Sequence, residues 1–136
     1  MKTSPTNPMN EEVTAGIRVQ VETQYQFQSS NPEQNHYVFA YRIRIKNLTE
    51  GPVQLLNRHW EISDCGQDMR VVDGSGVVGQ QPVLESGREF VYVSGCKLSS
   101  EIGKMVGYYE MENLITGKTF KVRIPQFVLE MPFKLN

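Results

Sequence analysis

The sequence predicts an all-β protein, an antiparallel β-sandwich with about seven main strands. Apolar and polar residues alternate in several segments of the chain, which places the apolar residues of each segment on one face of a strand. Clusters of turn-forming residues separate these segments at short intervals. None of the segments shows the apolar spacing of an amphipathic helix.

The clearest strands come first in the chain. Residues 17–27 alternate over their whole length, and a polar loop at residues 29–35 leads into a second alternating segment at 37–46. Strand spacing collects their apolar side chains on one face, whereas helical spacing would scatter them around a cylinder. We expect the core to contain Ile17, Val19, Val21, Tyr25, Phe27, Tyr37, Phe39, Tyr41, Ile43 and Ile45.

Two later segments change phase, which predicts bulges. In residues 53–63 the apolar phase shifts between Leu55 and Trp60, and a bulge there redirects Arg58 and His59. In the last strand the phase shifts across Pro125. The remaining predicted strands are short segments at 69–72 and 81–84 and longer ones at 89–94 and 105–111, with a loop at 94–103.

The chain is expected to form one domain, residues 15–136, preceded by a flexible N-terminal tail at residues 1–14. The tail is polar and contains two prolines, Pro5 and Pro8, a composition that cannot bury enough apolar surface to order itself.

Composition excludes several classes of function. Lys and Arg number 14 against 15 Asp and Glu, so the chain lacks the basic excess that binding to nucleic acid requires. It contains no apolar run of the roughly 18 residues that span a bilayer. The N-terminus lacks the apolar core of a signal peptide, and we therefore expect a cytoplasmic protein. Cys65 and Cys96 are too far apart in sequence for a redox or zinc motif, and no cofactor is expected.

Gly74, Gly76 and Gly79 have the G-x-G-x-x-G spacing of a dinucleotide-binding turn. That motif requires a strand before it and a helix after it, but Gln80, Gln81 and Pro82 follow here. Two other interpretations remain. The backbone N–H groups of the glycine loop could bind phosphate or pyrophosphate. Alternatively, the glycines could supply positive φ where the chain passes between sheets.

Arg58 and His59 are candidates for an interaction surface at the predicted bulge, next to Trp60, which is expected in the core. Catalysis by Ser94 or Cys96 with His59 and Asp64 lacks any local nucleophile signature, so no catalytic residue is predicted. A cation site built from Asp64, Asp68 and Asp73 has the oxygen ligands that hard cations prefer. Their spacing matches no known motif, however, and no metal ligand is predicted.

Several strings, in order along the chain, resemble the ApaG family: Leu56-Asn57-Arg58-His59-Trp60, Gly76-Val77-Val78-Gly79-Gln80-Gln81-Pro82, Tyr92-Val93-Ser94-Gly95-Cys96, Gly107-Tyr108-Tyr109-Glu110-Met111 and Ile124-Pro125-Gln126-Phe127. The resemblance implies an immunoglobulin-like sandwich of the fibronectin type III-like kind, a protein-interaction module, and an association with Co²⁺ tolerance and Mg²⁺ efflux. No enzymatic activity is established for that family. Ser75 and Gln80 stand where many relatives have acidic residues, which weakens any cation-binding role for the glycine loop.

These observations predict a non-enzymatic protein-interaction module associated with divalent cation homeostasis. The alternative is a small-ligand sensor that binds a phosphate-containing nucleotide or a divalent cation at Gly74, Gly76 and Gly79. Self-association through a sheet edge, giving a homodimer, is also open.

Overall fold

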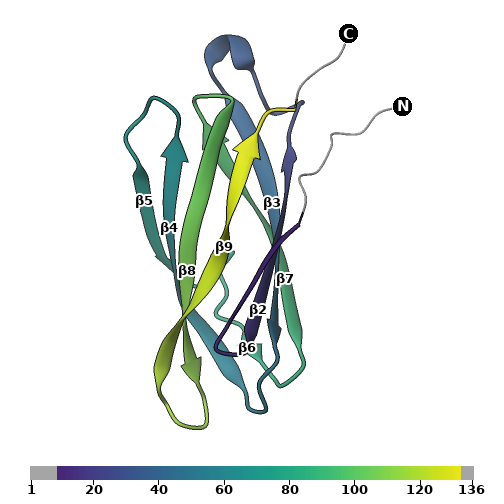
Figure 1. Cartoon of the computed structure of the whole chain (residues 1–136), viewed down its shortest axis with the longest axis vertical. Coiled ribbons are helices and arrows are strands. Elements are labelled where there is room, and N and C mark those ends of the chain that lie inside the picture. Colours follow the sequence, from purple (N-terminus) through teal and green to yellow (C-terminus); the bar gives the residue numbers. More distant parts are fainter. Residues whose placement is uncertain (1–8, 133–136) are drawn as a thin grey trace, which may run out of the picture.

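In the computed structural model, residues 9–132 are described and form two facing antiparallel β-sheets (Figure 1). One sheet has the strand order β1-β2-β3-β7, and the other has the order β5-β4-β8-β9, with β6 paired to β4. The strands are β1 Asn10–Thr14, β2 Ile17–Tyr25, β3 Tyr37–Asn47, β4 Val53–Asp64, β5 Arg70–Ser75, β6 Val83–Leu84, β7 Glu89–Leu98, β8 Ile102–Asn113 and β9 Thr119–Glu130. The predicted all-β antiparallel sandwich is confirmed. Strand β6 falls within the short segment predicted at 81–84, whereas β1 was not predicted.

The prediction of a flexible tail at residues 1–14 is wrong for its last part, because Asn10–Thr14 form β1 and pair with β2. Residues 1–8 lie outside the described residues. The polar sequence of β1 concealed this strand, since its order comes from backbone pairing and from polar contacts to β9. Asn10 donates to the carbonyl of Gln126 over 2.6 Å, and Glu12 pairs with Arg123 at 3.2 Å.

Both predicted bulges are confirmed. The register between β4 and β8 shifts between Leu55 and Asn57, and that between β8 and β9 shifts between Met105 and Gly107, opposite the segment with Pro125. The first shift lets Leu55 and Trp60 both reach the core although five positions separate them, which places His59 on the outer side of β4.

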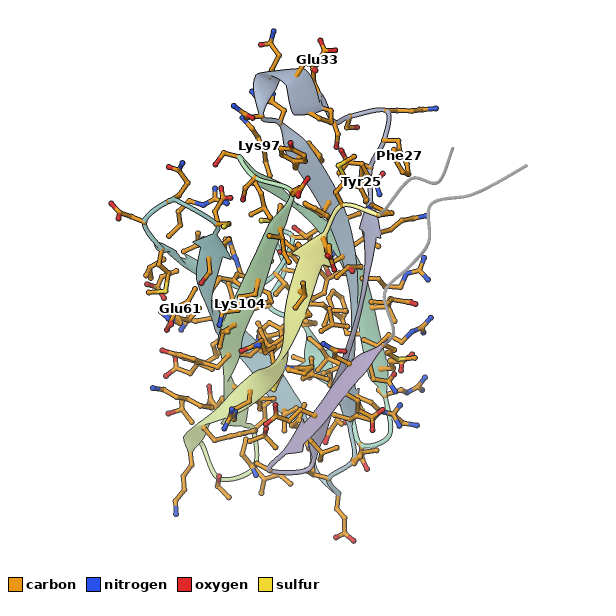
Figure 2. All side chains as sticks on the ribbon, turned by 45° about the horizontal axis from the view of Figure 1, so that its top comes forward. Tyr25, Phe27, Glu33, Glu61, Lys97 and Lys104 are labelled. Atoms are coloured by element: carbon orange, nitrogen blue, oxygen red, sulfur yellow. The ribbon has the colours of Figure 1, made fainter. Side chains whose placement is uncertain are left out.

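Two details of the predicted strands are corrected. The loop expected at 94–103 is mostly strand, because β7 continues to Leu98, which is fully buried, and β8 begins at Ile102. Phe27 lies beyond the end of β2 and is 37% exposed, so it is not a core residue. It packs edge-on against Tyr25 with ring centroids 4.8 Å apart, at the end of the sandwich seen in Figure 2.

The core lies between the sheets and is rich in aromatic rings. Trp60 is 3% exposed and packs edge-on against Tyr41 and Phe127. Tyr109, which is fully buried, shares a hydrogen bond between hydroxyl groups with Tyr92 of the other sheet. Burying each such side chain contributes about 1.5–3 kcal/mol, and the tyrosine pair satisfies the polar atoms that burial would otherwise leave without a partner.

Candidate functional site

An open groove of about 450 Å³ lies on the outer face of the sheet β5-β4-β8-β9. Four strands contribute to it, β4, β5, β8 and β9. The groove is lined by Asn57, Arg58, His59, Asp73, Gly74, Tyr108, Glu110 and Lys121.

His59 is held by two carboxylates. Its Nδ1 lies 2.6 Å from Asp73 Oδ1 on β5, and its Nε2 lies 3.0 Å from Glu61 Oε2 on β4. The hydrogen bonds with Glu61 and Asp73 raise the pKa of His59, and its partial burial opposes them only in part. Only the protonated imidazole can donate from both nitrogens, so this geometry favours a positively charged His59.

Tyr108 and Lys121 continue this arrangement across the sheet. The ring of Tyr108 on β8 stacks on His59, with centroids 4.8 Å apart and planes 23° apart. Lys121 Nζ of β9 lies 4.6 Å from the centre of the Tyr108 ring. At the other end of the groove Asn57 donates to Glu110 over 2.7 Å. The side chains of the groove are thus fixed by one another.

Arg58 does not share the outer position of His59. Alternation along β4 directs its side chain to the side of Trp60. Its Nη1 donates to the carbonyls of Ser75 and Gly76, at 3.0 and 2.8 Å. The guanidinium therefore ties the end of β5 to β4. Both residues of the predicted interaction pair border the groove, but only His59 projects its side chain from the outer face.

The glycine loop forms a tight backbone turn. Gly76 N–H donates to the carbonyl of Leu56, and Val77 and Gln80 exchange two backbone hydrogen bonds of 2.8 and 2.9 Å. The two residues between them, Val78 and Gly79, have φ of 42° and 78°, the pair of positive values typical of a type I′ turn. A Cβ on Gly76 would collide with the carbonyl of Gln80.

This geometry accounts for the loop without a ligand. The N–H groups of Gly76, Val77 and Gln80 are bonded inside the protein, so they do not converge on a bound anion. Binding of phosphate or a cation at Gly74, Gly76 and Gly79 stays a prediction, whereas the conformational interpretation has a direct structural basis.

Of the residues considered for catalysis, His59 is not bonded to Cys96 or Asp64, which both lie near Arg70. Cys96 is buried, burial raises the pKa of its thiol, and Arg70 Nη2 lies 3.8 Å from its sulfur. Asp64 is also buried and accepts hydrogen bonds from Ser99 and Ser100. His59 is instead bonded to Glu61 and Asp73. Cys65 is an exposed free thiol, and Cys96 is likewise unbridged.

The three aspartates considered for a cation are separated in the same way, since Asp64 is bound by serines and Asp73 by His59. Residues 9–132 contain no cluster of three or more His, Cys, Asp or Glu side chains arranged to hold a metal ion. Within the same residues, no helix has the length and apolar character needed to cross a membrane.

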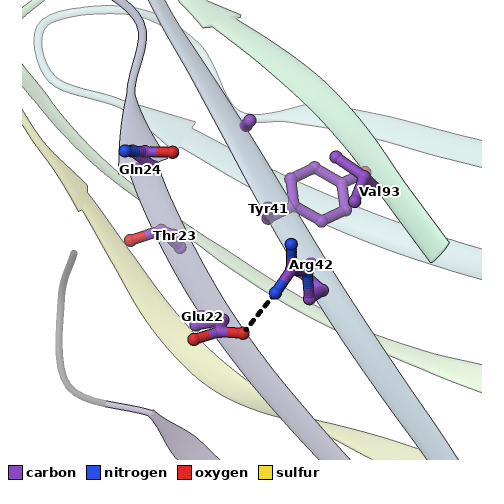
Figure 3. Close-up of a pocket in the computed structure, with 7 residues that line it drawn as sticks. Glu22, Thr23, Gln24, Tyr41, Arg42 and Val93 are labelled. Atoms are coloured by element: carbon purple, nitrogen blue, oxygen red, sulfur yellow. Dashed lines mark hydrogen bonds and ion pairs between the residues drawn. The ribbon is translucent and has the colours of Figure 1, made fainter. Parts of the chain in front are cut away.

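The second hollow is smaller, about 120 Å³, and lies on the outer face of the other sheet. Its lining includes Ala40 and, in the neighbouring cross-strand row, Val93 and the ion pair of Glu22 with Arg42 (Figure 3).

Comparison with known proteins decides the family, because the ApaG domain matches residues 27–113. The chain belongs to the ApaG family. Protein ApaG of Brucella suis biovar 1 is 46% identical over 120 residues, which cover 88% of this chain and 92% of that protein. The crystal structure of a Bordetella pertussis protein assigned as ApaA has a TM-score of 0.82 at 41% identity, covering 96% of this chain and 100% of the other. A second X-ray structure, of a structural-genomics target, has a TM-score of 0.81 at 39% identity, covering 88% and 90%.

The groove of this ApaG-family chain was not predicted as a unit. The sequence pattern singles out His59 but does not group it with Asn57 on the same strand, or with Tyr108 and Glu110 of β8 and Lys121 of β9, which are far from it in the chain. One signal was present, because Tyr108, Glu110 and Lys121 alternate with the apolar residues that are expected in the core and so face outward. Only the register, which sets His59 opposite both Asp73 and Tyr108, brings them together.

Proposed function

We propose that the protein is a non-catalytic interaction module of the cytoplasm whose groove around His59 receives a polar segment of a protein partner. The observation that supports this is the fixed geometry of the groove. His59 is held by Glu61 and Asp73 and stacks on Tyr108. The ammonium group of Lys121 lies over the ring of Tyr108. A surface whose side chains are already ordered loses little conformational entropy when it binds.

The chemistry of the groove suits a peptide better than an apolar small molecule. Its lining combines acceptors from Asp73 and Glu110 with a donor cation on Lys121, around one aromatic ring. The groove is open rather than enclosed, whereas pockets for small ligands bury most of the ligand in mainly apolar surroundings. The side chain of Asp73 is 69% exposed, so it can accept hydrogen bonds from a partner while it keeps its contact with His59.

The family resemblance extends the proposal to Co²⁺ and Mg²⁺ homeostasis, with the cation handled through the partner. A strain lacking the gene is then expected to lose Co²⁺ tolerance, and the wild-type gene restores it. Variants that abolish partner binding fail to restore it, which separates the role of the groove from that of the fold.

The interaction is tested with one charge reversal in the groove and one outside it. Lys121→Glu places an acidic group over Tyr108, whereas Lys104→Glu makes the same change on β8 of the same sheet, outside the groove. Cross-linking in cells identifies proteins captured by the wild type, and each purified candidate is titrated by calorimetry against the wild type and the variants. We expect Lys121→Glu and Tyr108→Ala to weaken binding at least about tenfold and Lys104→Glu to leave it unchanged. Equal binding by all variants refutes the groove as the binding site.

A further inference from the structure

Strand β7 forms one edge of its sheet and carries few of the features that protect edge strands. It pairs with β3 from Tyr37↔Leu98 to Lys46↔Glu89 without a register shift, and within the described residues no strand pairs with its other side. It contains no proline. Natural edge strands are commonly short, bulged or interrupted by proline or charge, but between Glu89 and Lys97 this one is long, regular and uncharged.

The free edge ends at Lys97. The carbonyl of Lys97 accepts a hydrogen bond of 2.8 Å from Arg70 Nη2 of β5, which approaches from outside the sheet. In an antiparallel sheet the N–H and C=O groups of alternate residues point to the same side. The N–H and C=O groups of Glu89, Val91, Val93 and Gly95 therefore point to the free edge, and Arg70 caps the next position.

The outer-face side chains of the same residues form an apolar centre. Val91 is 42% exposed and Val93 is 53% exposed, although both are large apolar residues on a regular strand. Glu89 and Lys97, of opposite charge, stand at the two ends of this stretch.

We propose that β7 pairs antiparallel with β7 of a second copy of this chain about a two-fold axis at Tyr92. In this register Val91 of each copy lies opposite Val93 of the other, and Glu89 lies opposite Gly95. Every free N–H and C=O group from Glu89 to Gly95 then has a partner. A register centred on Val93 instead sets Glu89 opposite Lys97, whose carbonyl Arg70 already occupies.

Charge and shape both fit this register. Glu89 of one copy lies diagonal to Lys97 of the other, a distance that long side chains bridge on a sheet face. Gly95 has no side chain, and its neighbour on β3 is Ala40. The hollow over Ala40 beside Val93 (Figure 3) leaves room for Glu89 of the second copy. Glu89 also contacts Arg44 at 3.4 Å and Arg18 at 3.9 Å in its own chain. Partly exposed ion pairs of this kind have low energy and allow Glu89 to turn.

A matched pair of double variants tests the interface and its register together. Val91→Lys with Val93→Glu sets Lys opposite Glu at each facing pair, whereas Val91→Lys with Val93→Lys sets Lys opposite Lys. Both variants place two charges at the same exposed positions, and circular dichroism verifies that both are folded. The full chain and the two variants are compared by sedimentation velocity over a dilution series.

We expect the wild type to dimerise and the Lys/Glu variant to keep a dissociation constant within about tenfold of it, while the Lys/Lys variant weakens the dimer by more than about tenfold. A wild type that stays monomeric throughout the series overturns the proposal, as does a Lys/Lys variant that dimerises as tightly as the wild type. Equal weakening by both variants overturns the register. In a register centred on Val93, the substituted position 93 of one copy faces the same position of the other, so both variants set like charges against each other there.

Discussion

The guanidinium of Arg58 lies over the α-carbon of Gly74, its cross-strand neighbour on β5. A Cβ at Gly74 would stand 2.7 Å from Cζ of Arg58, closer than van der Waals contact allows. The same guanidinium donates to the carbonyls of Ser75 and Gly76. The first glycine of the G-x-G-x-x-G motif therefore makes room for the side chain of an arginine.

Replacement of Gly74 by Ala is expected to displace this guanidinium and break both of its hydrogen bonds. Hydrogen bonds to charged groups contribute about 1.5–3 kcal/mol, so we expect a loss of about 1–3 kcal/mol in the free energy of unfolding, measured with urea. In an Arg58→Ala background the same substitution has nothing to displace, and its effect should largely disappear. An equal loss in both backgrounds contradicts the steric explanation.

Gly76 and Gly79 have similar positive φ values of 64° and 78° but different surroundings. A Cβ on Gly79 meets nothing within 4 Å, whereas one on Gly76 collides with the carbonyl of Gln80. Gly79→Ala is expected to cost about 1–2 kcal/mol for the left-handed conformation alone. Gly76→Ala should cost clearly more, because the turn must open to admit the methyl group. Thermal unfolding of the two variants measures the difference, and equal losses refute the collision.

The strands and bulges of this fold could be predicted because burial imposes a pattern on the sequence. The alternation from Ile17 to Tyr25 indicates one buried face, and the phase change between Leu55 and Trp60 marks the bulge. The strand at Asn10–Thr14 has no such signal, because polar contacts to β9 and pairing with β2 order it.

The groove could not be predicted for a different reason. His59, Tyr108 and Lys121 come from three strands, and their proximity depends on which strands are neighbours and in what register. Periodicity shows that each faces outward but does not show what lies beside it. The same limit applies to Arg58, whose partners on the glycine loop are backbone carbonyls.

The stability of the protein is expected to depend on the charge of His59. Its pKa is raised in the folded state by Glu61 and Asp73, so its contribution is fully present below the unfolded value of about 6.5 and is lost as pH rises through the folded pKa. The free energy of unfolding of the wild type should therefore exceed that of His59→Gln most at acidic pH. Urea titrations at a series of pH values test this.

A control for His59 is Asp73→Asn, which keeps the shape of the partner but removes its charge. It should reduce the pH dependence without abolishing it, because Glu61 remains 3.0 Å from Nε2. A difference between wild type and His59→Gln that is the same at acidic and alkaline pH contradicts the role of the two carboxylates.

Asp64 is expected to have the opposite pH dependence. Burial by itself raises the pKa of this carboxyl, but the hydrogen bonds from Ser100 and Ser99 outweigh burial and lower the pKa below its ordinary value of 3.8. Its contribution is therefore present above the unfolded value and is lost as pH falls through the folded pKa. Asp64→Asn turns an amide toward the serine donors and should cost about 1–3 kcal/mol at neutral pH. The cost should shrink in acid, where the wild-type carboxyl is protonated too.

Asp68→Asn is the control, at an exposed position four residues along the chain. It should leave the midpoint of urea unfolding unchanged at every pH. A loss of stability equal to that of Asp64→Asn would show that charge alone, not the serine contacts, stabilises this turn.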